Sequence, residues 1–239
     1  AGATGVDIRV GSTMTLVKIC GITNLEDALA AVDAGADALG FNFYPRSPRY
    51  ISPPNAREII AALPPSILKV GVFVNEELES LLRIAGEANL TALQLHGDES
   101  PEYCEQLRGK YVIKAFGAGI KFDWSTVDRY DVEAIMLDTK DDLLRGGTGR
   151  VFDWTIAHRG GESVAQRAGE PVAHRAGESA KSRAKLFLAG GLSPENVAAA
   201  IANVRPDAVD ACSSLEQTPG KKDHERVRAF INAVRGITP

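Results

Sequence analysis

Eight short apolar runs recur along the chain, and most are separated by segments with the apolar period of an amphipathic helix. Each run is five to seven residues long and rich in β-branched or aromatic residues, which is typical of buried strands rather than core helices. The pattern therefore predicts strands at 16–20, 38–43, 67–73, 91–96, 111–116, 134–138, 186–190 and 207–212.

Capping residues mark several of the intervening helices. Asn24 precedes a helical segment that Gly35 should end, Asn75 precedes a second, and Ser193 with Pro194 precedes a third. Short polar side chains accept hydrogen bonds from the first free amides of a helix, and glycine readily adopts the left-handed conformation that ends one. Each of these segments is thus predicted to be a helix that connects two strands.

Strands that alternate with helices pair in parallel through right-handed crossovers, and eight such units close a (β/α)₈ TIM barrel. An open, doubly wound sheet is the alternative, but the near-regular spacing of the strands favours the barrel. We expect one barrel domain over 14–239, preceded by a disordered extension at 1–13. Its α/β fold should carry one insertion, between strands 6 and 7.

The insertion contains a repeat of eight residues over 159–182, read as RGGESVAQ, RAGEPVAH and RAGESAKS. A helix turns about 100° per residue, so this period cannot keep one face on a core, and its glycines weaken a helix further. We interpret the repeat as a solvated surface expansion on the amino-terminal side of the barrel. An interaction module with His158 and His174 as ligands is the alternative.

Composition narrows the function. The net charge of −4 argues against nucleic acid or an anionic membrane as partner, and no apolar run is long enough to span a bilayer. The three cysteines are an odd number without zinc-finger spacing, which predicts free thiols and a cytoplasmic location.

Chemically capable side chains stand where predicted strands end, which in a barrel is the catalytic side. They are Cys20, His96, Asp138 and Asp210. Taken singly, each has an ordinary structural explanation, such as a buried apolar thiol or a helix cap. Two acids and a thiol at one rim make catalysis the stronger interpretation.

Two loops at the same rim are suited to phosphate. AGGLSPEN at 189–196 and CSSLEQTPG at 212–220 follow strands 7 and 8, where barrels commonly bind phosphate through backbone amides. RGGTGR at 145–150 is interpreted as a loop over the site. Arg46 and Arg49 follow strand 2, and either could bind a substrate carboxylate or lie in solvent.

The same residues carry a family resemblance. The motifs VKICGIT, FNFYPRSPRY, VGVFVNE, ALQLHGDE, LDTK, GGTGRVFDW, LAGGLSPENV and VDACSSLEQTPG resemble, in order, those of phosphoribosylanthranilate isomerases of tryptophan biosynthesis. The resemblance covers 17 to about 235 apart from the repeat. It implies a cofactor-free and metal-free Amadori rearrangement of a small phosphorylated substrate, by a monomer or homodimer.

The resemblance also implies roles. Cys20 would be the general base, Asp138 the general acid, and Arg49 a contact for the anthranilate part. The implied phosphate ligands are Gly190, Gly191, Ser213 and Ser214. His96 and Asp210 are expected at the substrate site without an assigned role, and His224 is expected on the surface.

Two features depart from the family pattern. Cys212 and Ser214 replace a serine and a glycine beside the expected phosphate site, and a serine would be strained there if the position required a positive φ. The chain also extends beyond the usual start, which makes Met14 a candidate first residue.

Three alternatives remain open at this level. A pentose-phosphate epimerase would commonly need metal-binding histidines at several strand ends, and only His96 lies at one. A related isomerase of histidine biosynthesis would use two aspartates, whereas this chain has Cys20. A non-catalytic barrel scaffold that binds a partner through the repeat is the third.

Overall fold

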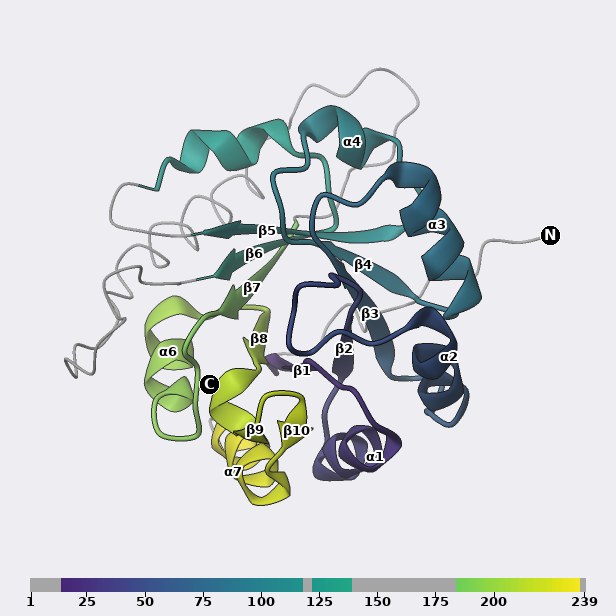
Figure 1. The fold of residues 1–239 in the computed structure, drawn as a ribbon. Coiled ribbons are helices and arrows are strands. Elements are labelled where there is room, and N and C mark those ends of the chain that lie inside the picture. The colour runs from purple at the N-terminus through teal and green to yellow at the C-terminus, as the bar shows by residue number, and fades with distance from the viewer. Residues whose placement is uncertain (1–13, 118–121, 139–183, 237–239) are drawn as a thin grey trace.

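The computed structural model describes residues 14–117, 122–138 and 184–236 of the 239-residue chain. Eight parallel strands form a closed barrel in which each strand pairs with the next and β8 returns to β1 (Figure 1). The predicted barrel is confirmed and the open sheet is excluded. The strands are β1 (Leu16–Cys20), β2 (Ala38–Asn42), β3 (Leu68–Phe73), β4 (Ala92–Leu95), β5 (Tyr111–Gly117), β6 (Ala134–Asp138), β7 (Lys185–Ala189) and β8 (Ala208–Ala211).

Helices surround this barrel on the outside (Figure 1). They are α1 (Leu25–Ala34), α2 (Pro53–Ala61), α3 (Leu78–Glu87), α4 (Pro101–Glu105), α6 (Val197–Val204) and α7 (His224–Arg235), with 3₁₀ turns η1 (Trp124–Arg129) and η2 (Ser213–Leu215). A two-stranded hairpin, β9 (Glu216–Thr218) and β10 (Lys221–Lys222), follows η2. No helix of the described residues is long and apolar enough to cross a membrane. The predictions for 1–13, 145–150 and 159–182 lie outside the described residues.

The strands alternate between two apolar layers. Val17 and Ile19 of β1 belong to the core between barrel and helices, whereas the interior of the barrel holds a second cluster that includes Val70, Met136 and Phe187. Both faces of each strand are covered, which explains why the runs read as continuously apolar. Lys18 and Asp210 are charged exceptions at inward positions, and these lead to the site.

Of the three helix starts predicted from capping residues, the structure confirms one and places the other two later in the chain. Asn24 accepts a hydrogen bond from the amide of Asp27 at 2.8 Å, and Gly35 ends α1 with φ 102°, as predicted. The helix expected after Asn75 begins only at Leu78, because Asn75 adopts φ 52° and accepts a hydrogen bond from the amide of Asp98. The prediction of Asn75 as a cap was wrong.

The helix expected after Ser193 and Pro194 also begins later, at Val197. The amide of Ser193 donates to the side chain of Asn196 at 2.8 Å, so these residues form a turn before α6. His224 is not simply on the surface: it is partly buried, and its Nε2 lies 2.8 Å from Oδ1 of Asp27. This contact ties the start of α7 to α1.

Candidate active site

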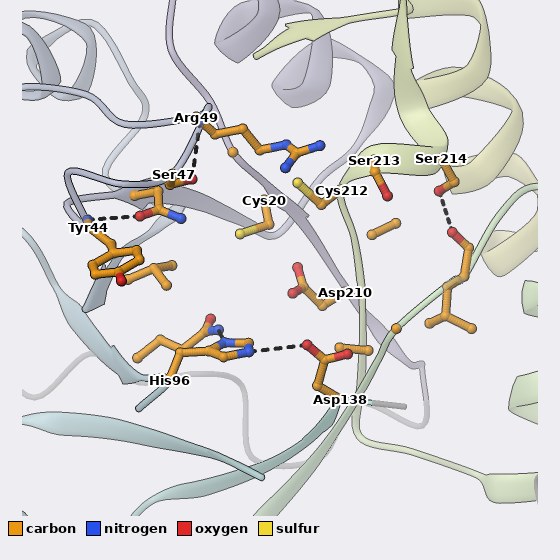
Figure 2. A pocket seen from close by; sticks show the side chains of 18 of the residues that line it. Cys20, Tyr44, Ser47, Arg49, His96, Asp138, Asp210, Cys212, Ser213 and Ser214 are labelled. Atoms are coloured by element: carbon orange, nitrogen blue, oxygen red, sulfur yellow. Dashed lines mark hydrogen bonds and ion pairs between the residues drawn. The ribbon is translucent and has the colours of Figure 1, made fainter. Parts of the chain in front are cut away.

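A cavity of about 560 Å³ opens at the carboxyl-terminal ends of the strands. All nine site residues expected from the sequence line it, and Figure 2 shows most of them facing one space. They are Cys20, Arg49, His96, Asp138, Gly190, Gly191, Asp210, Ser213 and Ser214. Arg46 does not line this cavity and is exposed, so of the two arginines only Arg49 belongs to the site.

The pairing of β1 with β8 builds the floor of this cavity. Lys18 stands opposite Asp210 in the register, both side chains point into the barrel, and Lys18 Nζ lies 2.9 Å from Asp210 Oδ1. Cys20 follows two residues later on β1 and Cys212 two residues after Asp210. The two thiols therefore lie one level above the ion pair, on the cavity side.

The charges around Cys20 favour its thiolate. A hydrogen bond from the thiol of Cys212 holds the pKa of Cys20 well below its usual range, despite burial, and Lys18 and Lys222 lower it further. The same coupling, together with burial, raises the pKa of Cys212. Burial also raises the pKa of Asp210 to about 7, although Lys18 opposes that shift. A thiolate at neutral pH is a competent base, and a neutral thiol is not.

Asp138 ends β6 and is held from one side only. Its Oδ2 lies 3.1 Å from Nε2 of His96 (Figure 2). On the other side of that ring, His96 Nδ1 lies 2.8 Å from Nε2 of Gln94. Oδ1 of Asp138 is buried and has no hydrogen-bond partner among the described residues. His96 thus orients the carboxyl group of Asp138, and the residue lines the cavity.

Arg49 is fixed by the hairpin that follows β8. Its Nε and Nη2 donate to the two carboxylate oxygens of Glu216 at 2.8 and 2.6 Å, and Lys222 Nζ donates to the same carboxylate at 3.0 Å. This bidentate geometry fixes the plane of the guanidinium. Arg49 is therefore a positioned cation at the cavity rather than a solvated one.

The two loops expected to bind phosphate lie side by side. Gly190 and Gly191 have φ of 88° and 65°, which L side chains rarely adopt. The hydroxyl of Ser214 donates to the carbonyl of Leu192, which joins the loop after β8 to the loop after β7. Ser214 is not among the positive-φ residues of the described chain, so its replacement of a glycine causes no backbone strain.

Sequence reasoning missed three charged residues that support this site: Lys18, Glu216 and Lys222. All three side chains are nearly or fully buried. Lys18 offered a signal, because a lysine at an inward position of an otherwise apolar strand must have a buried partner. Glu216 and Lys222 offered none, since their strands are too short to read from a pattern.

The barrel carries a thiol and a carboxyl group in one cavity, with the two loops after β7 and β8 beside them. This combination defines a TIM-barrel enzyme of the sugar-phosphate isomerase class. Residues 17–233 match the family model for N-(5′-phosphoribosyl)anthranilate isomerase. The chain belongs to this family.

Individual relatives agree. The chain is 48% identical over 225 residues to the N-(5′-phosphoribosyl)anthranilate isomerase of Thermotoga neapolitana, covering 94% of this chain and 100% of the relative. A phosphoribosylanthranilate isomerase solved in complex with reduced 1-(o-carboxyphenylamino)-1-deoxyribulose 5-phosphate is similar, with a TM-score of 0.74, 42% identity and coverage of 94% and 100%. Monomers generated from the dimeric enzyme of Thermotoga maritima give a TM-score of 0.73, with 42% identity and the same coverage.

Proposed function

We propose that the protein converts N-(5′-phosphoribosyl)anthranilate into 1-(2-carboxyphenylamino)-1-deoxyribulose 5-phosphate, a step of tryptophan biosynthesis, with Asp138 as general acid and Cys20 as general base. One observation carries the assignment: the two side chains come from β1 and β6 and face the same cavity, with the phosphate loops beside them (Figure 2). The family fixes the reaction, and the geometry supports the roles.

Asp138 acts first. Its carboxyl group donates a proton to the ring oxygen of the ribose, the C1′–O bond breaks, and the anthranilate nitrogen supplies the electron pair that forms the iminium ion. His96 contacts Oδ2 of Asp138 and thereby orients the carboxyl group. We propose His96 as the residue that orients Asp138.

Cys20 acts second. Its thiolate removes the proton from C2′, and the electron pair of that bond forms the C1′=C2′ double bond as the iminium nitrogen takes up its electrons. The resulting enolamine then tautomerises to the ketose. The iminium ion forms only after ring opening, and its positive charge makes the C2′ proton more acidic. The proton is therefore easiest to remove at the step in which Cys20 acts.

The remaining residues bind. Arg49, held by Glu216, would contact the anthranilate carboxylate, and a planar arginine suits a carboxylate better than lysine does. Gly190, Gly191, Ser213 and Ser214 would bind the 5′-phosphate through backbone amides, and Ser213 also through its hydroxyl, since the hydroxyl of Ser214 donates to Leu192. Asp210 lines the cavity below Cys20 and pairs with Lys18, and its place at the substrate site stays a prediction.

The rival functions each meet an obstacle. A metal-dependent epimerase would need a ligand cluster, and the described part of the chain contains no group of three His, Cys, Asp or Glu side chains placed to hold an ion. An isomerase with an aspartate pair would use Asp210 as base, but that carboxylate is engaged by Lys18.

The test is turnover of the fluorescent substrate. Phosphoribosylanthranilate made in place from anthranilate and phosphoribosyl pyrophosphate by the preceding transferase should lose its fluorescence when the purified protein is added. Chromatography should show the carboxyphenylamino ketose as the product. A fluorescence trace equal to the buffer control would contradict the proposal and leave the scaffold alternative.

Assembly and location remain proposals. The Thermotoga maritima relative is described as dimeric, and we propose a monomer or homodimer for this chain. Sedimentation equilibrium at micromolar concentration decides between them, and a larger species would contradict both. The free thiols agree with the cytoplasmic location proposed from the sequence.

A further inference from the structure

Lys18 is a charged residue in an apolar place. Its side chain is fully buried inside the barrel, on a level just above apolar residues such as Ala208 and Phe187. Burying an ammonium ion costs free energy that a single carboxylate, here Asp210, often fails to repay. A pair of hydrophobic residues would serve the core at least as well, so the pair calls for a role beyond stability.

Gly40 brings Lys18 and Cys20 together. It stands opposite Cys20 in the pairing of β1 with β2 and has no side chain to fill the space between the two groups. A Cβ placed on Gly40 would lie 2.8 Å from Cys20 Sγ and 3.1 Å from Lys18 Nζ. Both atoms therefore approach the same point beside Gly40.

We propose that Lys18 is the positioning residue for the base: its ammonium, anchored by Asp210, stabilises the thiolate of Cys20. The inference rests on the proposed function, since it assigns the support of the base in that reaction. Lys18 does not contact the substrate and acts only through the sulfur.

Other charged or titratable groups also face Cys20 and must be weighed against Lys18. From the elements packed around it, they are Asp210 of β8, Cys212 after β8, Lys222 of β10, Arg49 after β2 and Asp138 of β6. Lys222 and Arg49 both bind the carboxylate of Glu216, which offsets part of their charge. Lys18 comes from the same strand as Cys20 and reaches it directly.

The ionisation of the pair supports this arrangement. Burial opposes a charge on Lys18, yet Asp210 and Cys20 together raise its pKa above the usual range, so it stays an ammonium. The hydrogen bond from Cys212 is the largest cause of the lowered pKa of Cys20, and burial opposes it. Among the charged groups, Lys18 lowers that pKa most. Burial and the negative charge of Cys20 both raise the pKa of Asp210, and Lys18 lowers it.

The test is a thiol titration that needs no turnover. The rate of alkylation of Cys20 by iodoacetamide is measured against pH, with the Cys20 peptide quantified by mass spectrometry apart from those of Cys104 and Cys212. Lys18→Met should move the inflection at least one unit upward, which slows alkylation at lower pH roughly tenfold. Lys18→Arg keeps the charge and should restore most of the rate.

Two further comparisons guard against a merely structural effect. Lys114→Met removes another buried lysine, which lies on β5 and pairs with Glu99 at 3.0 Å. This change should leave the pH of the Cys20 inflection in place. Asp210→Asn and the double variant Lys18→Met/Asp210→Asn both have a neutral residue at 210, so their difference isolates Lys18. This pair serves if Lys18→Met alone does not fold.

The outcomes separate the two proposals. The role of Lys18 is overturned if the inflection moves by only a few tenths of a pH unit in Lys18→Met, or between Asp210→Asn and the double variant. This holds even if the protein is an active isomerase. A shift in Cys20 with Lys114→Met as large as with Lys18→Met overturns it too. A protein with the expected titration but no turnover of phosphoribosylanthranilate instead overturns the proposed function.

Discussion

Cys20 shows how little a residue type says about its chemistry. The chain has three cysteines, and Cys104, buried behind the barrel on α4, has a pKa raised to about 11 by its burial. Cys20 is buried too, but it faces Cys212, Lys18 and Lys222, and its pKa is shifted in the opposite direction. The neighbours at the rim, and not exposure, favour the thiolate of Cys20, whereas burial favours the neutral thiol of Cys104.

Arg49 should matter for binding rather than for the chemical step. Arg49→Lys keeps the charge but loses the two-pronged contact with Glu216, so we expect KM for phosphoribosylanthranilate to rise roughly tenfold with kcat nearly unchanged. Steady-state kinetics on both variant and wild type measure this. A loss confined to kcat would contradict a binding role.

The raised pKa of Asp210 should make the free energy of unfolding depend on pH. Burial raises its pKa to about 7 in the folded protein, against about 3.9 in the unfolded chain. The folded state therefore holds the proton more tightly, and stability from this group is lost as pH rises. Relative to Asp210→Asn, the free energy of unfolding of the wild type should fall between about pH 4 and pH 7, by at most about 1.4 kcal/mol per unit.

Urea unfolding of both proteins at several pH values measures that difference. Above about pH 8 the carboxylate is ionised in both states and the difference should become constant. A wild type that gains stability over Asp210→Asn as pH rises from 4 to 7 would show that Lys18 outweighs burial, and would contradict the raised pKa.

At the scale of the element, two asparagines explain what a local pattern can and cannot predict. Asn24 caps α1 through a contact three residues away, which the sequence displays. The side chain of Asn75 instead accepts a hydrogen bond from the backbone amide of Asp98, and its own backbone amide donates to Glu99. Asp98 and Glu99 both lie in the loop after β4. These partners belong to the next βα unit, so no reading of the residues around Asn75 could have placed them.

The helix α3 offers an independent check on the fold. Gly86 lies within this helix, and a Cβ added there meets no atom within 4 Å. Gly86→Ala should therefore raise the free energy of unfolding by about 0.5–1 kcal/mol, since alanine loses less conformational entropy. Gly35→Ala is the matched control and should destabilise, because Gly35 has φ 102°. Chemical denaturation of both variants tests the pair, and a loss in Gly86→Ala would contradict the placement of α3.

At the scale of the whole molecule, the strand pattern was enough to predict the barrel, because eight apolar runs with crossovers have few alternative arrangements. It also placed the expected site residues at one rim, since parallel strands end on the same side. It could not predict the ion pair of Lys18 with Asp210, which joins residues far apart in sequence, nor the contact of His96 with Asp138. Register between strands decides both.

The repeat at 159–182 remains a sequence prediction, and its removal tests it. If it is a solvated expansion, replacing these residues with a short glycine–serine linker should leave kcat and KM within about threefold of the wild type, because loop length changes closure entropy slowly. A loss of more than tenfold with the barrel still folded would favour the alternative of an interaction or catalytic module.

The roles of Cys20 and Asp138 are tested most sharply by the kcat of Cys20→Ser and Asp138→Asn on phosphoribosylanthranilate, with Cys104→Ser as control. Cys104 is buried in α4 and does not line the cavity, so the same substitution there should leave kcat nearly unchanged. We expect Cys20→Ser and Asp138→Asn each to lose at least about a hundredfold in kcat, the usual range for a general acid or base. Activity in either variant close to that of Cys104→Ser would contradict the acid–base pair.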